Sequence, residues 1–316
     1  MNLCNLSTVR ELLDRYGLAP RKGFGQNFLI NPDVPARIAG SSALGFDCGW
    51  GGADSTAPEG VCALEIGPGI GAMTRELSGL FEKVLAVEID RGLIPLLSET
   101  LEDCDNVTVI NEDFMNLSLK DLLRENFGDS PVRICANLPY YITSPILMAV
   151  LEAYKPSERP QVESITVLVQ NEVADRLCAE AGSNEYGSIT AAVNLCGEAK
   201  KLFTVPAGCF YPAPKVTSAV VQITLYKNGV RAAFDSLPED DGELDKLIAL
   251  AKRLIAAAFA QRRKTLTNAL SSVSPKEKTE AALEALGLRT DIRGEKLSAK
   301  DFVAIAKYIR GDDNDK

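Results

Sequence analysis

The stretch VCALEIGPGIGAMTRELSGL, residues 61–80, decides the fold of this chain. Its first six residues form an apolar run that is too short for a helix and is typical of a buried strand. Gly67 and Gly69 follow, and glycine lets a backbone turn tightly and pass close to a ligand because no Cβ intervenes. A helical pattern begins after Ala72. The stretch therefore predicts a strand, a ligand-binding turn and a helix, although a bare glycine turn also occurs without any ligand.

Composition limits the classes of protein that remain. The chain has 316 residues, 46% of them hydrophobic, which is enough for two domains and a large core. It has no histidine, which excludes Ser-His-Asp and Cys-His catalysis. The cysteines form no C-x-x-C pair, so we expect neither a disulfide framework nor a metal site. No basic start precedes an apolar segment, so we expect no membrane span and a cytoplasmic location.

Short β-rich runs alternate with helical patterns from residue 61 onward. We expect strands at residues 61–66, 84–88, 107–111, 132–137 and 165–170. The helical patterns cover residues 73–80, 93–101, 117–125, 144–153 and 172–181. This alternation predicts a Rossmann-like α/β fold, a parallel doubly wound sheet that binds its ligands at the carboxyl ends of the strands.

Further elements are expected before and after this alternation. Thr8 and Glu11 fit a capping box, which predicts a short leading helix. Residues 21–29 are not periodic and fit either a surface loop or a ligand lid. Residues 201–205 and 218–225 flank a proline-rich corner and predict an antiparallel hairpin at the sheet edge.

Two segments of low periodicity divide the chain. Residues 41–60 are rich in Gly, Ser and Ala and predict a flexible insertion, whose Trp50 has no evident role. The polar, acidic residues 229–242 predict a linker. We therefore expect a catalytic domain over residues 1–228 and a small all-helical domain over residues 243–316.

Polar side chains follow three successive predicted strands. Glu88 ends the second strand, where a carboxylate accepts hydrogen bonds from a ribose diol in NAD and S-adenosylmethionine enzymes alike. Asp113 follows the third strand, where it can accept the amino proton of a cofactor adenine. The sequence NLPY, residues 137–140, follows the fourth. Because the carboxyl ends of parallel strands meet at one edge, these groups are expected to share a site.

The NLPY sequence suits the chemistry of an exocyclic amine. The adenine amine is a poor nucleophile because its lone pair is delocalised into the ring. If Asn137 Oδ1 and the Pro139 carbonyl each accept one N–H, the lone pair can point at an electrophilic methyl group. Tyr140 is then expected to stack on the flipped base, with Phe210 on its other face. Direct methyl transfer needs no histidine.

Taken together, the motifs resemble the KsgA-type (RsmA) small-subunit ribosomal RNA adenine N6,N6-dimethyltransferases. The resemblance runs from about residue 8 to residue 309 and includes Glu88 and Asp113. Its other motifs are GQNFL (25–29), EIGPG (65–69), NLPY (137–140), QNEV (170–173), FYPAPKV (210–216) and QRRKTL (261–266). It implies S-adenosylmethionine as cofactor and dimethylation of two adjacent adenines in the 3′-terminal hairpin of 16S rRNA, within a pre-30S particle and by a monomer.

The resemblance also implies the residues that bind. The expected cofactor contacts are Gln26, Asn27, Leu29, Gly67, Gly69, Glu88, Ile89, Asp113, Phe114 and Asn137. A net charge of −9 is unusual for a protein that binds RNA, so phosphate contacts must come from local clusters. Those expected are Arg21 with Lys22, and Arg262, Arg263 and Lys264.

Other functions remain open on the sequence alone. A large-subunit rRNA adenine N6-methyltransferase of the macrolide-resistance type resembles the same core, although QRRKTL and the helical tail favour the small-subunit enzyme. A non-catalytic RNA-binding assembly factor on the same fold is a second alternative, and the intact NLPY sequence argues against it. A dehydrogenase is the third, because the glycine turn and Glu88 also suit NAD.

Overall fold

A seven-stranded sheet forms the centre of the first part of the chain, in the order β4-β3-β2-β5-β6-β9-β7. This computed structural model describes residues 1–20, 26–44, 57–158, 160–227 and 229–314. The strands are β2 (Cys62–Ile66), β3 (Val84–Glu88), β4 (Val107–Asn111), β5 (Val132–Asn137), β6 (Val162–Gln170), β7 (Gly197–Val205) and β9 (Ser218–Leu225). All pairs formed among β2, β3, β4, β5 and β6 are parallel, whereas the pair between β6 and β9 is antiparallel. The predicted parallel α/β sheet is confirmed.

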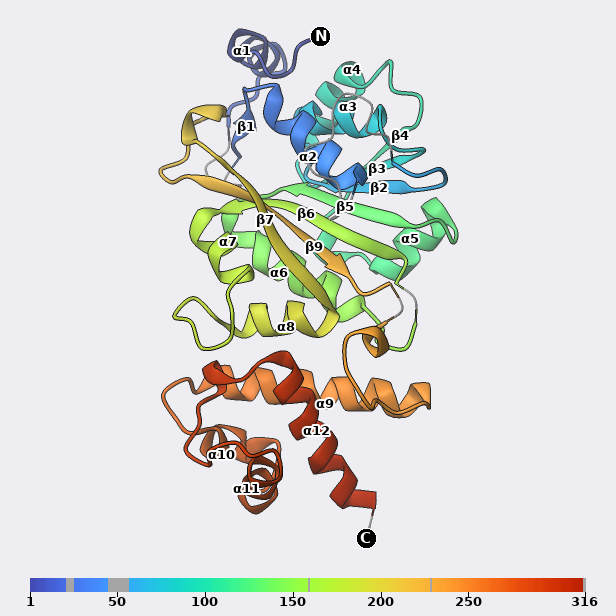
Figure 1. The fold of residues 1–316 in the computed structure, drawn as a ribbon. Helices are drawn as coiled ribbons and strands as arrows, with labels where there is room; N and C mark the ends of the chain where they lie inside the picture. Colours follow the sequence, from blue (N-terminus) through green and yellow to red (C-terminus); the bar gives the residue numbers. More distant parts are fainter. Residues whose placement is uncertain (21–25, 45–56, 159, 228, 315–316) are drawn as a thin grey trace. The chain divides into compact units, whose positions relative to one another are not determined.

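Helices cover both faces of this sheet (Figure 1). On one side lie α2 (Asp33–Leu44), α3 (Ala72–Ser78) and α4 (Ile94–Thr100); on the other lie α5 (Leu119–Phe127) and α6 (Tyr140–Ala153). Every residue of β2 and β3 is buried, as expected for parallel strands with helices on both sides. Their continuous apolar runs therefore reflect burial on two faces.

Several local predictions need correction. The first helix, α1 (Leu6–Arg15), is capped by Asn5, whose Oδ1 accepts hydrogen bonds from the backbone N–H of Ser7 and Thr8. The Thr8 capping box is therefore wrong, because a residue before Thr8 already caps the helix. Residues 41–44 extend α2, so the start of the expected insertion is helical, and the rest of that insertion up to residue 56, with Trp50, lies outside the described residues.

Two short strands join distant parts of the chain. β1 (Phe28–Leu29) pairs antiparallel with β8 (Phe210–Tyr211), with Leu29 opposite Phe210. The Ile30 N–H donates to the Cys209 carbonyl at 2.8 Å and extends the pairing. Residues 26–29 are thus held beside the aromatic corner, a pairing that their sequence did not predict.

The chain packs into two compact units. The first comprises Met1–Ala153, Gln161–Ala174 and Lys200–Thr224, and the second comprises Tyr154–Pro160, Asp175–Ala199 and Leu225–Lys316. The second unit therefore also takes in segments that precede the expected linker at residues 229–242. The domain boundary predicted there stays a prediction.

The second unit is built from helices. They are α8 (Ser188–Cys196), which the sequence did not predict, α9 (Asp241–Ala260), α10 (Leu266–Ala269), α11 (Lys276–Ala285) and α12 (Ala299–Asn314); α7 (Asn171–Leu177) begins in the first unit and ends in the second. Tyr186 is fully buried in its core, with its ring 5.7 Å from that of Phe259.

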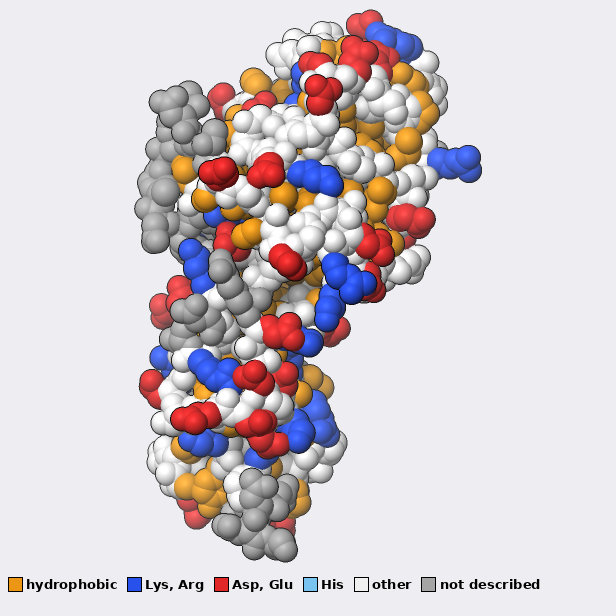
Figure 2. Space-filling model, turned by 90° about the vertical axis from the view of Figure 1, so that its right-hand side faces the viewer, with side chains coloured by type: hydrophobic (Ala, Val, Ile, Leu, Met, Phe, Trp, Pro, Cys, Tyr) orange, Lys and Arg blue, Asp and Glu red, His pale blue; other side chains and the backbone are white. Residues whose placement is uncertain are grey.

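The surface carries charges of both signs (Figure 2). Acidic and basic side chains are interspersed over the face shown in Figure 2, so the net charge of −9 does not collect there into one acidic field. Within the described part of the chain, no helix is both long and apolar enough to cross a membrane.

Candidate active site

A cavity of about 350 Å³ opens at the carboxyl ends of β2, β3, β4 and β5. Twelve of the residues that the sequence assigned to catalysis or cofactor binding line it: Gln26, Asn27, Leu29, Gly67, Gly69, Glu88, Ile89, Asp113, Phe114, Asn137, Pro139 and Phe210. The topology therefore brings together side chains that lie as far apart in the sequence as Gln26 and Phe210. Tyr140 begins α6 beside this cavity, but its side chain is outside what the structure describes.

The glycine turn forms the floor of the cavity. Gly67 and Gly69 adopt φ values of 74° and 61°, a region that residues with a Cβ rarely enter. The Gly67 N–H donates to the Val87 carbonyl at 2.9 Å, which ties the turn to the end of β3. Both positions therefore require glycine for conformational reasons, apart from any contact with a ligand.

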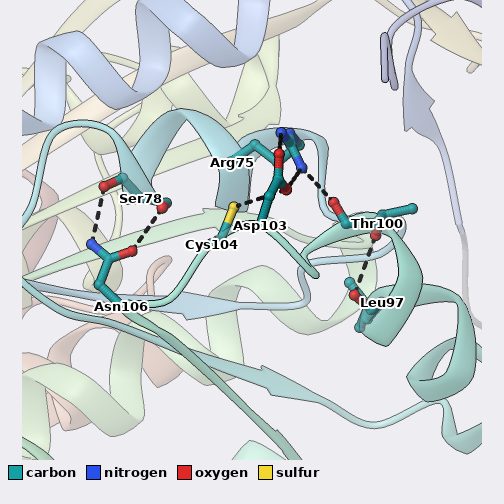
Figure 3. A network of polar contacts seen from close by, with 7 residues as sticks. All are labelled: Arg75, Ser78, Leu97, Thr100, Asp103, Cys104 and Asn106. Atoms are coloured by element: carbon teal, nitrogen blue, oxygen red, sulfur yellow. Dashed lines mark hydrogen bonds and ion pairs between the residues drawn. The ribbon is translucent and has the colours of Figure 1, made fainter.

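A polar network fixes the helix that follows this turn (Figure 3). Arg75 of α3 donates to the Thr100 carbonyl at 2.7 Å and to Asp103 Oδ2 at 2.6 Å. Ser78 Oγ donates to Asn106 Oδ1 at 2.7 Å. The Arg75 guanidinium lowers the pKa of the Asp103 carboxyl to about 2, so this pair stays ionised at neutral pH. The network anchors α3 to the segment that leads into β4 and holds the turn in place.

Glu88 is buried and connects two strand ends. One carboxylate oxygen accepts the Gly69 N–H at 3.1 Å, and the other accepts the Asp90 N–H at 2.8 Å. Burial raises the pKa of Glu88, and these backbone bonds oppose that rise. The Ile89 N–H is a third backbone donor to this group, and because a carboxylate has about four acceptor positions, one is left for a ligand hydroxyl.

Gln26 continues this network over the cavity. Its Nε2 donates to Asp90 Oδ2 at 3.0 Å, while Asp90 Oδ1 accepts the Gly92 N–H at 3.0 Å. Asp90 is only 4% exposed. Gln26, Asp90 and Glu88 thus form a continuous chain of contacts from residues 26–29 to the glycine turn, which we call the clasp.

The ends of β3 and β4 present one apolar and one acidic group. Ile89 is 50% exposed. Asp113 Oδ1 accepts the Met115 N–H at 2.9 Å and caps the short helix η3 (Phe114–Asn116). Phe114 is buried beneath them. The arrangement offers an apolar face and a carboxylate side by side, which suits a flat heterocycle with an amino group.

An amide side chain, that of Asn137, lies at the end of β5 and lines the cavity. Asn137 Nδ2 lies 3.5 Å from the Asn27 carbonyl, to which it donates. Only the NH₂ group of an amide can donate, so this contact leaves Oδ1 as the acceptor of a side chain that lines the cavity. The Asn27 backbone therefore orients Asn137.

Pro139 is more engaged than the sequence suggested. Its carbonyl accepts the Ile142 N–H at 3.1 Å and the Thr143 hydroxyl at 3.2 Å, both in the first turn of α6. A carbonyl has two lone pairs, so both are already in use. Phe210, at 3% exposed, is a core residue that also forms a cavity wall.

Of the residues expected to bind phosphate, none of those that the structure describes lines the cavity. Arg21 and Lys22 lie outside the described residues. In the second unit, Arg262 donates to the Tyr186 carbonyl at 3.2 Å and pairs with Glu295 at 3.6 Å. Arg263 and Lys264 are exposed next to it.

Several of the lining residues were not predicted as site residues, among them Glu65, Glu112, Met115 and Tyr141. Glu65 is 1% exposed, and its Oε2 has no hydrogen-bond partner. A carboxyl group inside the apolar run 61–66 was the available signal for it. Together with Glu88 and Asp113, these residues give the cavity four carboxyl groups, whereas no lysine or arginine is among the described residues that line it.

This sheet, with its glycine turn and its acidic strand ends, defines a Rossmann-like S-adenosylmethionine-dependent methyltransferase. The family model described as "Ribosomal RNA adenine dimethylase" matches residues 17–311. The chain belongs to this ribosomal RNA adenine dimethylase family.

Relatives of similar length support this assignment. The chain is 40% identical over 305 residues to "Ribosomal RNA small subunit methyltransferase A" of Lachnoclostridium phytofermentans, covering 95% of this chain and 94% of that one. It is 39% identical to the protein of the same name from Bacillus licheniformis, covering 96% and 95%.

Two solved structures share the fold. The 23S rRNA methyltransferase ErmE superposes with a TM-score of 0.64 at 24% identity, covering 90% of this chain and all of that one. A dimethyladenosine transferase from Plasmodium falciparum gives 0.64 at 22% identity, covering 88% and 95%.

The cavity fits S-adenosylmethionine, the cofactor of this class, better than it fits a dinucleotide. The sulfonium and ammonium groups of this cofactor are cationic, and the lining is acidic. A dinucleotide would bring a pyrophosphate toward this acidic lining, where only the backbone N–H groups at the start of α3, and no described lysine or arginine, could offset the repulsion. This electrostatic mismatch weighs against the dehydrogenase alternative.

Glu65 gives the folded protein a pH dependence. Burial raises its pKa from 4.5 to about 8, and the Glu88 charge adds to the effect. Between these pH values the unfolded chain has lost the proton that the folded chain keeps. The free energy of unfolding therefore falls as the pH rises through this window, by up to about 1.4 kcal/mol per pH unit. Chemical denaturation across the window should show a steeper fall for wild type than for Glu65→Gln.

The exposed Glu112 provides the matched control, since Glu112→Gln removes a carboxyl group from the same cavity without removing a buried one. Its pH profile should follow wild type. Parallel profiles for wild type and Glu65→Gln would show that Glu65 ionises normally in the folded protein.

The clasp makes a prediction about cofactor affinity. Gln26→Glu places two carboxylates face to face, and we expect it to raise the Kd for S-adenosylmethionine about tenfold, as for the loss of a hydrogen bond to a charged group. Adding Asp90→Asn exchanges donor and acceptor. The amide introduced at position 90 can donate to the carboxylate introduced at position 26, while its oxygen still accepts the Gly92 N–H.

Titration calorimetry should show that the double variant recovers most of the lost affinity. A double variant that binds no tighter than Gln26→Glu would contradict the clasp.

Proposed function

We propose that this protein transfers two methyl groups from S-adenosylmethionine to N6 of each of two adjacent adenines in the 3′-terminal hairpin of 16S rRNA. The observation that carries the proposal is the position of Asn137, which lines the same cavity as the glycine turn and whose Nδ2 donates to the Asn27 carbonyl, so that Oδ1 is its acceptor. The relatives named small subunit methyltransferase support the choice of the small-subunit rRNA.

The chain's own residues hold the cofactor and aim the amine. When bound, S-adenosylmethionine supplies an electrophilic methyl group. Glu88 accepts hydrogen bonds from the ribose, and Asp113 accepts from the adenine amine with the exposed face of Ile89 against the ring. Asn137 Oδ1 accepts one N–H of the target adenine, which turns the nitrogen lone pair toward the methyl group.

Pro139 supplies the second acceptor through an exchange. Its carbonyl must release the Thr143 hydroxyl before it can accept the other N–H of the target amine, because both of its lone pairs are occupied. A hydroxyl can rotate about its C–O bond, so this exchange needs no backbone movement. Tyr140 and Phe210 hold the faces of the flipped base.

The RNA is held by charge at a few positions. Arg262 is held by the Tyr186 carbonyl and by Glu295, whereas Arg263 and Lys264 present their charges at the surface. Arg21 and Lys22 are proposed as a second phosphate contact. We propose further that the substrate is the rRNA within a pre-30S particle in the cytoplasm, and that the enzyme acts as a monomer.

A large-subunit rRNA methyltransferase is the nearest alternative. ErmE shares the fold at 24% identity, whereas the relatives near 40% identity carry the small-subunit name. Mass spectrometry of both rRNAs from cells lacking the gene decides between them. Loss of dimethyladenosine from the large-subunit rRNA alone would overturn the proposal.

The two strand-end residues should separate binding from transfer. We expect Asn137→Ala to lower kcat at least a hundredfold while changing the cofactor Kd little, because it removes the acceptor for the target amine. Glu88→Ala should raise the cofactor Kd first, since it removes the ribose acceptor. Calorimetry combined with single-turnover methylation measures both. Equal loss of cofactor affinity in the two variants would contradict this division.

The basic cluster should set the salt dependence. We expect the double change of Arg263 and Lys264 to Ala to weaken RNA binding and to reduce the slope of log K against log salt by about 1 to 2, since each phosphate contact contributes about 0.7 to 0.9. Lys276→Ala, which removes an exposed cation from α11, is the control and should leave the slope unchanged. An unaltered slope in the double variant would remove the cluster from the RNA surface.

A further inference from the structure

Exposed apolar side chains gather at the mouth of the cavity. Among the described residues, six large apolar side chains are exposed, and three of them line this cavity: Ile89 at 50%, Met115 at 42% and Tyr141 at 63%. Under the proposed function, the exposed face of Ile89 packs against the adenine ring of the cofactor. Met115 and Tyr141 have no part in the chemistry described above.

Met115 and Tyr141 lie on adjoining elements. Met115 is in η3, directly after Asp113 and Phe114, and Tyr141 is in the first turn of α6, two residues after Pro139. These two elements pack against each other. Together, the two side chains form an uncharged surface at the rim, which we call the stacking shelf.

The side chains of the stacking shelf are far more exposed than those of the inner walls of the cavity. Leu138 and Phe210 also line the cavity, but they are only 6% and 3% exposed. A base whose amine reaches Asn137 Oδ1 must lie between inner walls of this kind. A side chain that is 63% exposed, as Tyr141 is, is available instead to a group that stays at the mouth.

We propose that the stacking shelf binds the unpaired base next to the target adenine. This inference rests on the proposed function and adds a second base-binding site to it. An enzyme that pulls one base from its stack leaves a neighbouring base with an uncovered face. An exposed aromatic ring replaces that lost partner, and such stacking is sequence-tolerant because every base has a π face. Methionine adds a polarizable contact that adapts to the edge of a ring.

The occupant is a base rather than the cofactor or a phosphate. The cofactor groups are assigned to Glu88, Asp113 and Ile89, which lie at the ends of β3 and β4. A phosphate is disfavoured by the carboxyl groups of the lining, because no lysine or arginine is among the described residues that line the cavity. The π face of a tyrosine suits any base, so the shelf holds the neighbour without selecting its sequence.

Kinetics with unmethylated small ribosomal subunits test the shelf. We expect Tyr141→Ala to raise the KM for the subunit about tenfold, the lower end of what the loss of one base–aromatic stack costs, while kcat falls less than about threefold and the cofactor Kd stays the same. Tyr141→Phe keeps the ring and should behave as wild type. Val216→Ala removes another exposed apolar side chain, one that does not line the cavity, and is the matched control.

A fluorescent base reports stacking directly. A single-stranded RNA that carries 2-aminopurine next to the target adenine should be quenched by wild type and by Tyr141→Phe, and should stay bright with Tyr141→Ala. The salt slope of binding should be the same for all three proteins, because the shelf makes no phosphate contact.

Each other outcome overturns the proposal. A fall in kcat without a change in KM would place Tyr141 against the target base itself. A raised cofactor Kd would place it in the cofactor site, and an unchanged KM with unchanged quenching would leave the shelf without a base. These results differ from failure of the proposed function, in which wild type itself would not methylate the subunit.

Discussion

The hydrogen bonds to the Glu88 carboxylate are the interaction on which the site depends. One oxygen receives the Gly69 N–H from the turn after β2, and the other receives the Asp90 N–H from beyond β3. Two neighbouring strand ends are thereby fixed to a single buried group. Replacing it by an apolar residue would leave two backbone donors without partners near the core, which is costly. The same carboxylate therefore serves the structure and, under the proposed function, the cofactor, and its position cannot vary independently of the turn.

The second constraint is the strap formed by residues 26–29. It is held at one end by Gln26 through Asp90 and at the other by the pairing of β1 with β8. The Asn27 carbonyl between these two anchors meets the Asn137 amide. An amide oriented by a backbone carbonyl stays oriented only as long as that backbone is held. The clasp thus also bears on Asn137, the group proposed to aim the target amine.

The sequence predicted the sheet better than it predicted the contacts between motifs. The strands β3, β4, β5 and β9 have the bounds expected from their apolar runs, because burial leaves a local signature in the sequence. Eight of the twelve expected residues that line the cavity lie there because parallel strands end at one edge, whereas Gln26, Asn27, Leu29 and Phe210 come from the segments joined by the β1–β8 pairing.

Other features had no local signature. The β1–β8 pairing joins residues about 180 positions apart, and a two-residue strand shows no periodicity. The engaged carbonyl of Pro139 depends on α6 beginning at Tyr140, earlier than the pattern at residues 144–153 indicated. No sequence pattern singles out Tyr141, and its 63% exposure at the cavity mouth is known only from the structure.

The acidic balance of the chain is consistent with a positively charged cofactor and a negatively charged substrate, because the two meet different surfaces. Four carboxyl groups line the cavity, and burial keeps one of them, Glu65, protonated at neutral pH, so the lining carries less negative charge than its composition suggests. A wholly ionised lining would repel an approaching phosphate backbone more strongly. The uncharged shelf at the rim adds no charge of either sign. The cavity can therefore attract a cation within, while the base proposed at its mouth and the phosphates proposed at Arg263 and Lys264 involve other groups.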